Sequence, residues 1–258
     1  MVSAAIKRLS VSAAALFIVI ICSSSKDLTR NKKNTGPVKI SFVHSVKTLP
    51  LVLDSMEYSN PFNETYRVSS LKYYISNIVI NSNKQSFKEP ESYHLIDAAD
   101  SSSWQFGFDV VENDYSSISF MIGVDSIKNV SGAQTGALDP LHGMFWTWNS
   151  GYIFFKLEGH SPVSNMFNKK IEYHIGGFSG ANNALRTVTL QFPAGSLLQV
   201  KKGKETELVI NADIDQLWQA TSNLQIATTP ATMTPGPLSI KIADNYSRMF
   251  TIKEVINH

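Results

Sequence analysis

The chain has 258 residues, of which 43% are hydrophobic, 10% aromatic and 17% charged. This is enough chain for a sizeable core, and the low share of charged residues excludes a wholly disordered protein. The 23 basic and 21 acidic residues nearly balance and form no basic block, which excludes a nucleic-acid-binding protein.

The N-terminus has the pattern of an export signal. Lys7 and Arg8 supply a positive n-region, and residues 11–21 supply an apolar stretch. This stretch is about half of the roughly 20 residues that a membrane-spanning helix needs. We therefore expect residues 1–22 to direct export, and their removal leaves equal numbers of basic and acidic residues.

Cys22, the single cysteine, follows the apolar stretch directly. This placement resembles a bacterial lipoprotein signal, in which the cysteine becomes the lipidated first residue. The bulky Ile21 departs from the small residue usual there, so a cleaved signal without lipid remains the alternative. In both cases the body has no disulfide, and we expect it in the periplasm or at the outer membrane of a Gram-negative bacterium. Residues 23–36 are polar and without periodicity, which predicts a flexible tether.

From Pro37 onward, apolar and polar residues alternate repeatedly with the period of β-strands. The apolar faces are Val38, Ile40 and Phe42; Ile118, Phe120 and Ile122; Ile153, Phe155 and Leu157; Ile171, Tyr173 and Ile175; and Val188, Leu190 and Phe192. Only residues 214–220 and 245–256 suggest short helices. Residues 37–258 are therefore predicted to form one all-β domain, a single antiparallel β-sandwich with long loops.

The most unusual stretch is 136–159. If residues 142–150 are extended, His142, Met144, Trp146 and Trp148 share one face. Imidazole and thioether groups suit Cu(I), and a tryptophan can offer its π-face to a cation. The alternative is that Met and Trp on one strand face form ordinary core.

Other residues give weaker signals for metal binding or catalysis. The remaining histidines are His44, His94, His160, His174 and His258, and none has the spacing of a zinc protease. His44 continues the apolar face of residues 38–42, and His174 points away from the apolar face of its strand. Scattered loop Asp and Asn residues could hold calcium, but they form no EF-hand. No nucleophile elbow or nucleotide-binding motif is present.

The segment 136–159 is similar to the signature of the MbnP-like copper-binding proteins, which are associated with methanobactin operons and other copper-homeostasis loci. The matching pieces are Phe42-Val43-His44, Leu71 to Asn77, Ile122 to Asp125, Met144 to Trp148, Gly151-Tyr152, Leu157-Glu158-Gly159 and His174-Ile175-Gly176. The resemblance covers roughly residues 38–220. It implies an exported, β-rich copper-binding protein without enzymatic activity.

The resemblance also implies a modified site. In this family a partner dihaem enzyme of the cytochrome c peroxidase/MauG type oxidises the first tryptophan of a Trp-x-Trp motif to kynurenine, and the product binds one Cu(I). The corresponding residue here is Trp146. His44 and His174 stand at the family-like histidine positions, and His142 and Met144 are local alternatives as ligands.

Two rival functions remain open from the sequence. The first is a structural or adhesive β-sandwich lipoprotein that binds no metal and uses its tryptophans as core. The second is a hydrolase or carbohydrate binder that uses exposed Trp104, Trp146 or Trp148 as stacking platforms. No recognisable catalytic constellation accompanies these aromatic residues.

Overall fold

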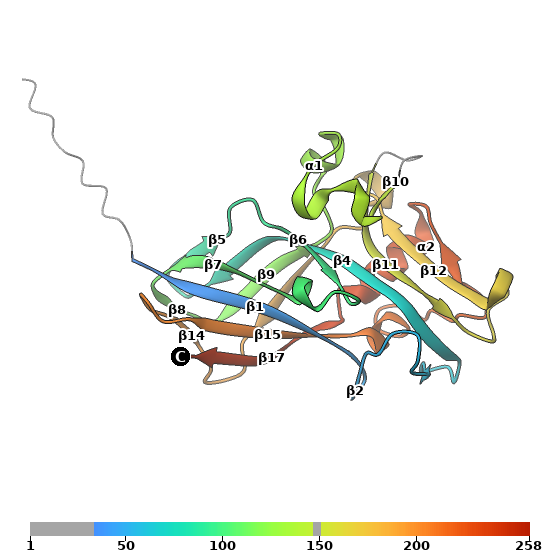
Figure 1. Ribbon diagram of the computed structural model, residues 1–258, viewed down its shortest axis with the longest axis horizontal. Coiled ribbons are helices and arrows are strands. Elements are labelled where there is room, and N and C mark those ends of the chain that lie inside the picture. Colours follow the sequence, from blue (N-terminus) through green and yellow to red (C-terminus); the bar gives the residue numbers. More distant parts are fainter. Residues whose placement is uncertain (1–33, 147–150) are drawn as a thin grey trace, which may run out of the picture. The chain divides into compact units, whose positions relative to one another are not determined.

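Two β-sheets pack face to face in the computed structural model, which describes residues 34–146 and 151–258 (Figure 1). The smaller sheet has the order β17-β15-β1-β2, with β7 paired to the free edge of β1. Its strands are β1 (Thr35–Val46), β2 (Leu49–Pro50), β7 (Gln105–Val111), β15 (Thr206–Asp213) and β17 (Phe250–Asn257).

The larger sheet has the order β13-β9-β4-β11-β12-β16, and the short strands β3, β5, β6 and β10 pair with β4 or β11. Its strands are β3 (Tyr58–Ser59), β4 (Thr65–Asn81), β5 (Ser86–Lys88), β6 (Tyr93–Asp97), β9 (Ser117–Ile122), β10 (Phe145–Trp146), β11 (Gly151–His160), β12 (Lys170–Gly176), β13 (Arg186–Gln191) and β16 (Ala231–Thr232). A separate small pair consists of β8 (Asn113–Tyr115) and β14 (Leu198–Val200).

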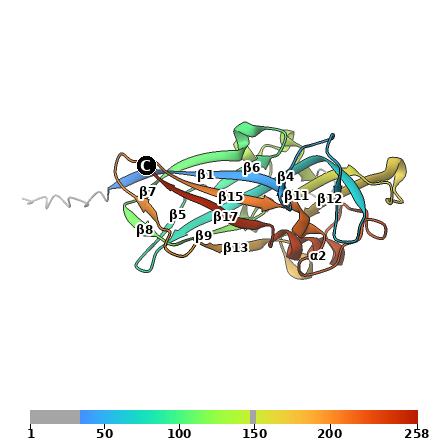
Figure 2. The same cartoon turned by 90° about the horizontal axis from the view of Figure 1, so that it is seen from below.

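Aromatic side chains fill the space between the two sheets. Phe42 of β1 lies 6.1 Å from Tyr73 of β4 and 6.3 Å from Phe120 of β9, measured between ring centroids. Phe250 of β17 packs against Tyr73 and Phe120 at 5.6 and 5.3 Å. Figure 2 shows the same two layers from below. The all-β sandwich predicted from period-2 alternation is thus confirmed.

One prediction about strand direction was wrong. Most neighbouring strands are antiparallel, but β1 and β15 run parallel in the centre of the smaller sheet, as do β12 and β16 at one edge of the larger. A pair of strands joined by a short hairpin must be antiparallel. The long stretch of chain between β1 and β15 removes that constraint. Alternation within each strand does not reveal its direction.

The predicted boundary at Pro37 also moves by two residues, because β1 begins at Thr35. A Cβ on Gly36 would lie 2.3 Å from the carbonyl oxygen of Lys201, so this glycine permits a close approach of two backbones. Residues 1–33, including the predicted signal and Cys22, lie outside the described residues. Within the described ranges, no helix is both long and apolar enough to cross a membrane.

The short helices lie only partly where the sequence predicted them. The helical elements are α1 (Ser126–Val130), α2 (Pro237–Tyr246) and the 3-10 turns Ser101–Trp104, Gly136–Leu138, Pro140–His142, Phe167–Lys169, Gly180–Asn182 and Ile214–Leu217. The turn at 214–217 falls inside the predicted 214–220 helix. The predicted 245–256 helix is wrong, since α2 ends at Tyr246 and β17 follows. Buried Asn245 uses its amide to bond Leu217 and Ser222, which fixes this end of α2.

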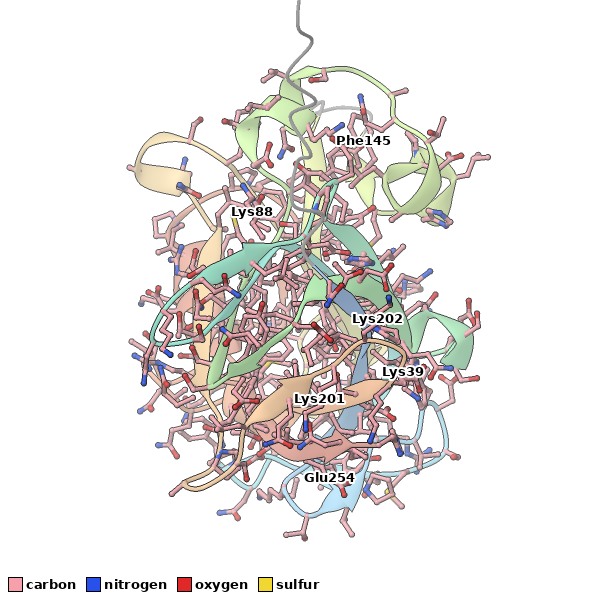
Figure 3. All side chains as sticks on the ribbon, turned by 90° about the vertical axis from the view of Figure 1, so that its left-hand side faces the viewer. Lys39, Lys88, Phe145, Lys201, Lys202 and Glu254 are labelled. Atoms are coloured by element: carbon pink, nitrogen blue, oxygen red, sulfur yellow. The ribbon has the colours of Figure 1, made fainter. Side chains whose placement is uncertain are left out.

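A connecting segment, residues 123–146, covers part of the outer face of the larger sheet, over β4 and β11. Tyr152 of β11 is bound to this segment, because its backbone N–H donates a hydrogen bond to Asn129 Oδ1 at 2.9 Å. The Tyr152 and Tyr74 hydroxyls donate to the carbonyls of Leu138 and Ala137 at 2.7 and 3.1 Å. In Figure 3, Phe145 marks this segment at the top, and Glu254 marks the smaller sheet at the bottom. These bonds hold the segment on the outer face of the larger sheet around Tyr74 and Tyr152.

Candidate functional site

Trp146 lies at the end of β10, opposite Gly151, and is 5% exposed. Its ring rests on the backbone of Gly176 in β12. A Cβ on Gly176 would lie 2.6 Å from Cζ3 and 2.9 Å from Cη2 of Trp146, closer than real Cβ contacts occur. The missing side chain of Gly176 therefore makes the space that the benzo half of the indole fills.

His174 lies two residues before Gly176 on the same strand. Two residues of an extended strand span roughly 7 Å, so His174 is a near neighbour of the Trp146 contact. The side chain of His174 is 14% exposed, and its Nε2 lies 2.7 Å from Oε1 of Glu158 on β11. Trp146, one of the predicted ligands, thus packs on the face of β12 that also carries His174, another of them.

Two side chains, those of His174 and Lys156, contact the carboxylate of Glu158. Besides His174, the ammonium group of Lys156 lies 3.2 Å from the same Oε1 atom. The hydrogen bond from His174, aided by Lys156, lowers the pKa of Glu158 to about 2. This carboxylate is therefore ionised at neutral pH.

The two family-like histidines lie on opposite faces of the larger sheet. Residues directly opposite one another in neighbouring strands share a face, and successive residues alternate between faces. Across β4, β11 and β12, one row contains Tyr73, Phe155 and Ile175, and the next contains Lys72, Lys156 and His174. His44 Nε2 lies 3.0 Å from the hydroxyl oxygen of Tyr73. His44 is therefore on the inner face and His174 on the outer face, so the predicted set of three ligands is not assembled.

His44 is buried beside aromatic side chains. It is 9% exposed, and its ring packs edge-on against Trp104 at 5.3 Å. Its Nδ1 atom is buried and has no hydrogen-bond partner within residues 34–146 and 151–258. Burial lowers the pKa of His44 to about 4, so the ring is neutral at neutral pH. A cavity of about 400 Å³ beside it is lined by Leu49, Pro50, Asn211 and other residues.

The predicted row His142, Met144, Trp146 and Trp148 is only partly present. His142 ends a 3-10 turn, is exposed, and places Nε2 3.0 Å from the carbonyl oxygen of Gly136. Gly143 then adopts a left-handed conformation, so the extended strand begins only at Phe145. Asp139 caps the turn through the backbone N–H of Leu141, a local signal that the alternation analysis missed. Met144 is fully buried, and Trp148 lies outside the described residues.

Other predicted features lie elsewhere. Among residues 34–146 and 151–258, no three His, Cys, Asp or Glu side chains come together as a metal-binding group. Asp125 and Asp139 cap helical turns through their side chains, and Asp97 pairs with Lys72. Trp146 is buried, which removes it as an exposed stacking platform, and Trp104 is partly buried against His44.

Sequence reasoning missed two residues of this site, Gly176 and Glu158. Both belong to short pieces of the family resemblance, Leu157-Glu158-Gly159 and His174-Ile175-Gly176. The contact between Glu158 and His174 depends on the register of β11 and β12, in which Glu158 lies two residues beyond Lys156, the residue directly opposite His174. No pattern within one strand gives that register.

The geometry defines a class of protein: a β-sandwich in which a buried tryptophan and a carboxylate-bound histidine lie on the outer face of one sheet. The chain belongs to the MbnP family, whose model matches residues 35–234. The family resemblance predicted from the sequence is thus confirmed.

The fold is also similar to a solved structure, MbnP from Methylosinus trichosporium. The TM-score is 0.55 and the sequences are 13% identical, with 86% of this chain and 99% of that chain covered. At this identity the likeness shows a shared fold alone. Comparison with curated proteins gives no match.

Proposed function

We propose that this protein is an exported Cu(I)-binding protein that serves copper acquisition or homeostasis and is not an enzyme. His174 and an oxidised Trp146 would hold the metal. Membership in the MbnP family supports the class of function. The observation that carries the site is the contact between Trp146 and Gly176, which lies two residues after His174 on the same strand.

The side chains beside Gly176 suit copper only after a covalent change. Neutral imidazole is a good ligand for copper, and His174 can supply one nitrogen. An intact indole N–H is a donor with no free lone pair for a metal. Oxidation of Trp146 to kynurenine replaces this group by an aniline nitrogen and a ketone oxygen, both of which carry lone pairs.

The oxidation balances if a partner enzyme uses hydrogen peroxide. The bond between Cγ and Cδ1 of the indole breaks, Cγ becomes the ketone, and Cδ1 leaves as formate. Two molecules of peroxide are reduced for each tryptophan, and one water is released. The partner that the family resemblance implies is a dihaem enzyme of the cytochrome c peroxidase/MauG type. The side chain loses one carbon and gains one oxygen, a mass change of about +4 Da.

The fold accommodates this change without losing its contact. Cζ3 and Cη2, the atoms that rest on Gly176, belong to the benzo ring, which kynurenine retains. A recess of about 280 Å³ beside Trp146 is lined by residues that include Asn129, Gly177 and Phe178, and it leaves room for a rearranged side chain. Met144, fully buried two residues earlier, is a further thioether candidate. His44 has no part in this proposal.

The test is mass spectrometry and copper analysis of the full chain, expressed with and without the partner enzyme. We expect the mass shift at Trp146 and tight copper binding only with the partner. Trp146→Phe should lose both, and Trp148→Phe should keep the shift. His174→Ala should keep the shift and lose copper, whereas His44→Gln should keep both. Stoichiometric copper in Trp146→Phe would instead favour the local His142 and Met144 alternative.

Export and anchoring form a separate part of the proposal. Residues 1–22 would act as the signal, and Cys22 would carry lipid that holds the protein at the membrane through the tether 23–36. Detergent phase partitioning of the native protein and Cys22→Ser tests this. We expect only the native protein in the detergent phase, and aqueous partitioning of both would leave an ordinary cleaved signal.

The metal-free alternative is a structural or ligand-binding β-sandwich lipoprotein. One observation favours it: Trp146 is buried as a core residue would be. Protein purified from its native host decides between the two functions. Absence of both the mass shift and copper would support the structural alternative.

A further inference from the structure

We infer that Glu158 is a positioning residue for His174, which it orients so that Nδ1 is the nitrogen presented to a ligand. This inference deepens the proposed copper site and rests on it. Glu158 itself touches no metal in this arrangement. Its effect is on the tautomer and the orientation of the His174 ring.

The direction of the hydrogen bond follows from the chemistry of the two groups. Nε2 of His174 and Oε1 of Glu158 are 2.7 Å apart. An ionised carboxylate can only accept hydrogen bonds, so Nε2 must carry the hydrogen. A neutral imidazole has one N–H and one lone pair, which leaves the lone pair of His174 on Nδ1.

The other ring nitrogen is available. Within residues 34–146 and 151–258, Nδ1 of His174 makes no hydrogen bond. The side chain is only 14% exposed, so the ring is held and is not freely rotating in solvent. A rotation that offered Nε2 to a metal would have to break the bond to Glu158.

A second contact fixes the carboxylate. Lys156 stands directly opposite His174 in the β11–β12 register, and its Nζ lies 3.2 Å from the same Oε1 of Glu158. Lys156, Glu158 and His174 therefore form a connected set on the outer face. Glu172 has no such role, because its carboxylate pairs with Lys170 at 3.2 Å.

This arrangement has a known consequence for metal sites in general. A carboxylate that accepts the second N–H of a ligating histidine fixes its tautomer and raises its basicity, and loss of the carboxylate lowers metal affinity about 10–100-fold. We expect the same loss when Glu158 is replaced, together with a change of tautomer that needs no metal to be observed.

The experiment uses the full chain labelled with ¹⁵N-histidine. Long-range proton–nitrogen correlation spectra of the metal-free protein report the tautomer of His174. We expect the Nε2–H form in the native protein, a mixture in Glu158→Leu, and partial retention in Glu158→Gln, whose amide oxygen still accepts. Glu172→Leu is the matched control, and it should keep the native tautomer. Thermal unfolding confirms that each variant is folded.

Cu(I) affinity is then measured on the oxidised protein by competition with a chromophoric chelator. Glu158→Leu should bind about 10–100-fold more weakly than Glu172→Leu. An unchanged tautomer in Glu158→Leu overturns the inference, as does a changed tautomer with unchanged affinity. If the oxidised native protein binds no copper, the proposed function fails, and the tautomer in the metal-free protein still decides what Glu158 does to His174.

Discussion

The surroundings of His44 and His174 differ in almost every physical respect. His44 is buried between the sheets, with Tyr73 as its neutral partner and Trp104 against its ring. His174 lies on the outer face, bound to an ionised carboxylate that also contacts Lys156. Burial keeps the His44 ring neutral, whereas the carboxylate beside His174 selects which nitrogen carries the proton.

Two histidines that short motif matches assign to one site can therefore have different roles in the fold. In the inner environment desolvation dominates, so His44 contributes to the packing of the core and its charged form is disfavoured. In the outer environment specific hydrogen bonds dominate, so His174 has a defined orientation beside Trp146. Three substitutions test this contrast.

Gly176→Ala should disrupt the outer environment most strongly. The new Cβ would meet the Tyr152 carbonyl oxygen at 2.5 Å and Trp146 Cζ3 at 2.6 Å. Because one neighbour is backbone, it cannot move aside easily, and overpacking should lower the free energy of unfolding by about 3 kcal/mol. Urea unfolding measures this loss. Gly236→Ala is the control, since its Cβ would meet nothing within 4 Å and its φ of 170° is extended. Equal stability of the two variants would contradict the packing of Trp146 on Gly176.

Because of His44, the free energy of unfolding should decrease as the pH falls below neutral. Burial lowers its pKa to about 4 from the ordinary 6.5, so between these values the unfolded chain binds a proton that the folded chain does not. The free energy of unfolding therefore decreases as pH falls through this window, by about 2 kcal/mol between about pH 7 and about pH 5.

His44→Gln should remove this part of the pH dependence, because a glutamine amide cannot take up the proton yet can still bond the Tyr73 hydroxyl. Urea unfolding at the two pH values measures the difference between the variants. His160→Gln, at an exposed position of β11, is the control and should leave the pH dependence unchanged. A native protein and His44→Gln with parallel pH profiles would mean that His44 is not desolvated.

The sequence predicted those features of the fold that depend on a pattern within a single strand. Alternation in strands such as 38–42 and 171–175 predicted both the sandwich and the inward direction of His44. It failed where the decisive contact is between strands. The parallel pairing of β1 and β15, the pairing of Glu158 with His174, and the placement of Gly176 under Trp146 all depend on register. His142 was misplaced because an Asp139 cap and a left-handed glycine interrupt the strand.

The family-like histidines show the same limit. Short motifs identified His44 and His174 as a pair, but a motif does not say which face of a sheet its residue occupies. The face on which a residue lies follows from the register of β4, β11 and β12. This register pairs residues of β4 with residues about 80 to 100 positions later in the chain. The tryptophan segment was a better predictor, because β10 and β11 form a local hairpin.

Lys72→Met should change the free energy of unfolding least. The dependence of this change on salt distinguishes a solvent-screened ion pair from a desolvated group. Lys72 stands directly opposite Asp97 in the β4–β6 register, with Nζ 2.9 Å from Oδ2. Both side chains keep contact with water, at 24% and 19% exposed. Ion pairs in such positions contribute about 1 kcal/mol or less, because solvent screens their attraction and ordering the side chains costs entropy.

We expect Lys72→Met to lower the free energy of unfolding by about 0.5 kcal/mol at low salt, and by less at about 1 M salt, where screening is strong. Lys84→Met, at an exposed position with no ion pair among the described residues, is the control. The His44 effect should not respond to salt, since desolvation and not an ion pair causes it. A salt-insensitive loss above 1 kcal/mol in Lys72→Met would mean that charge on the outer face is as desolvated as the His44 ring. The contrast between the two environments would then rest on hydrogen bonding alone.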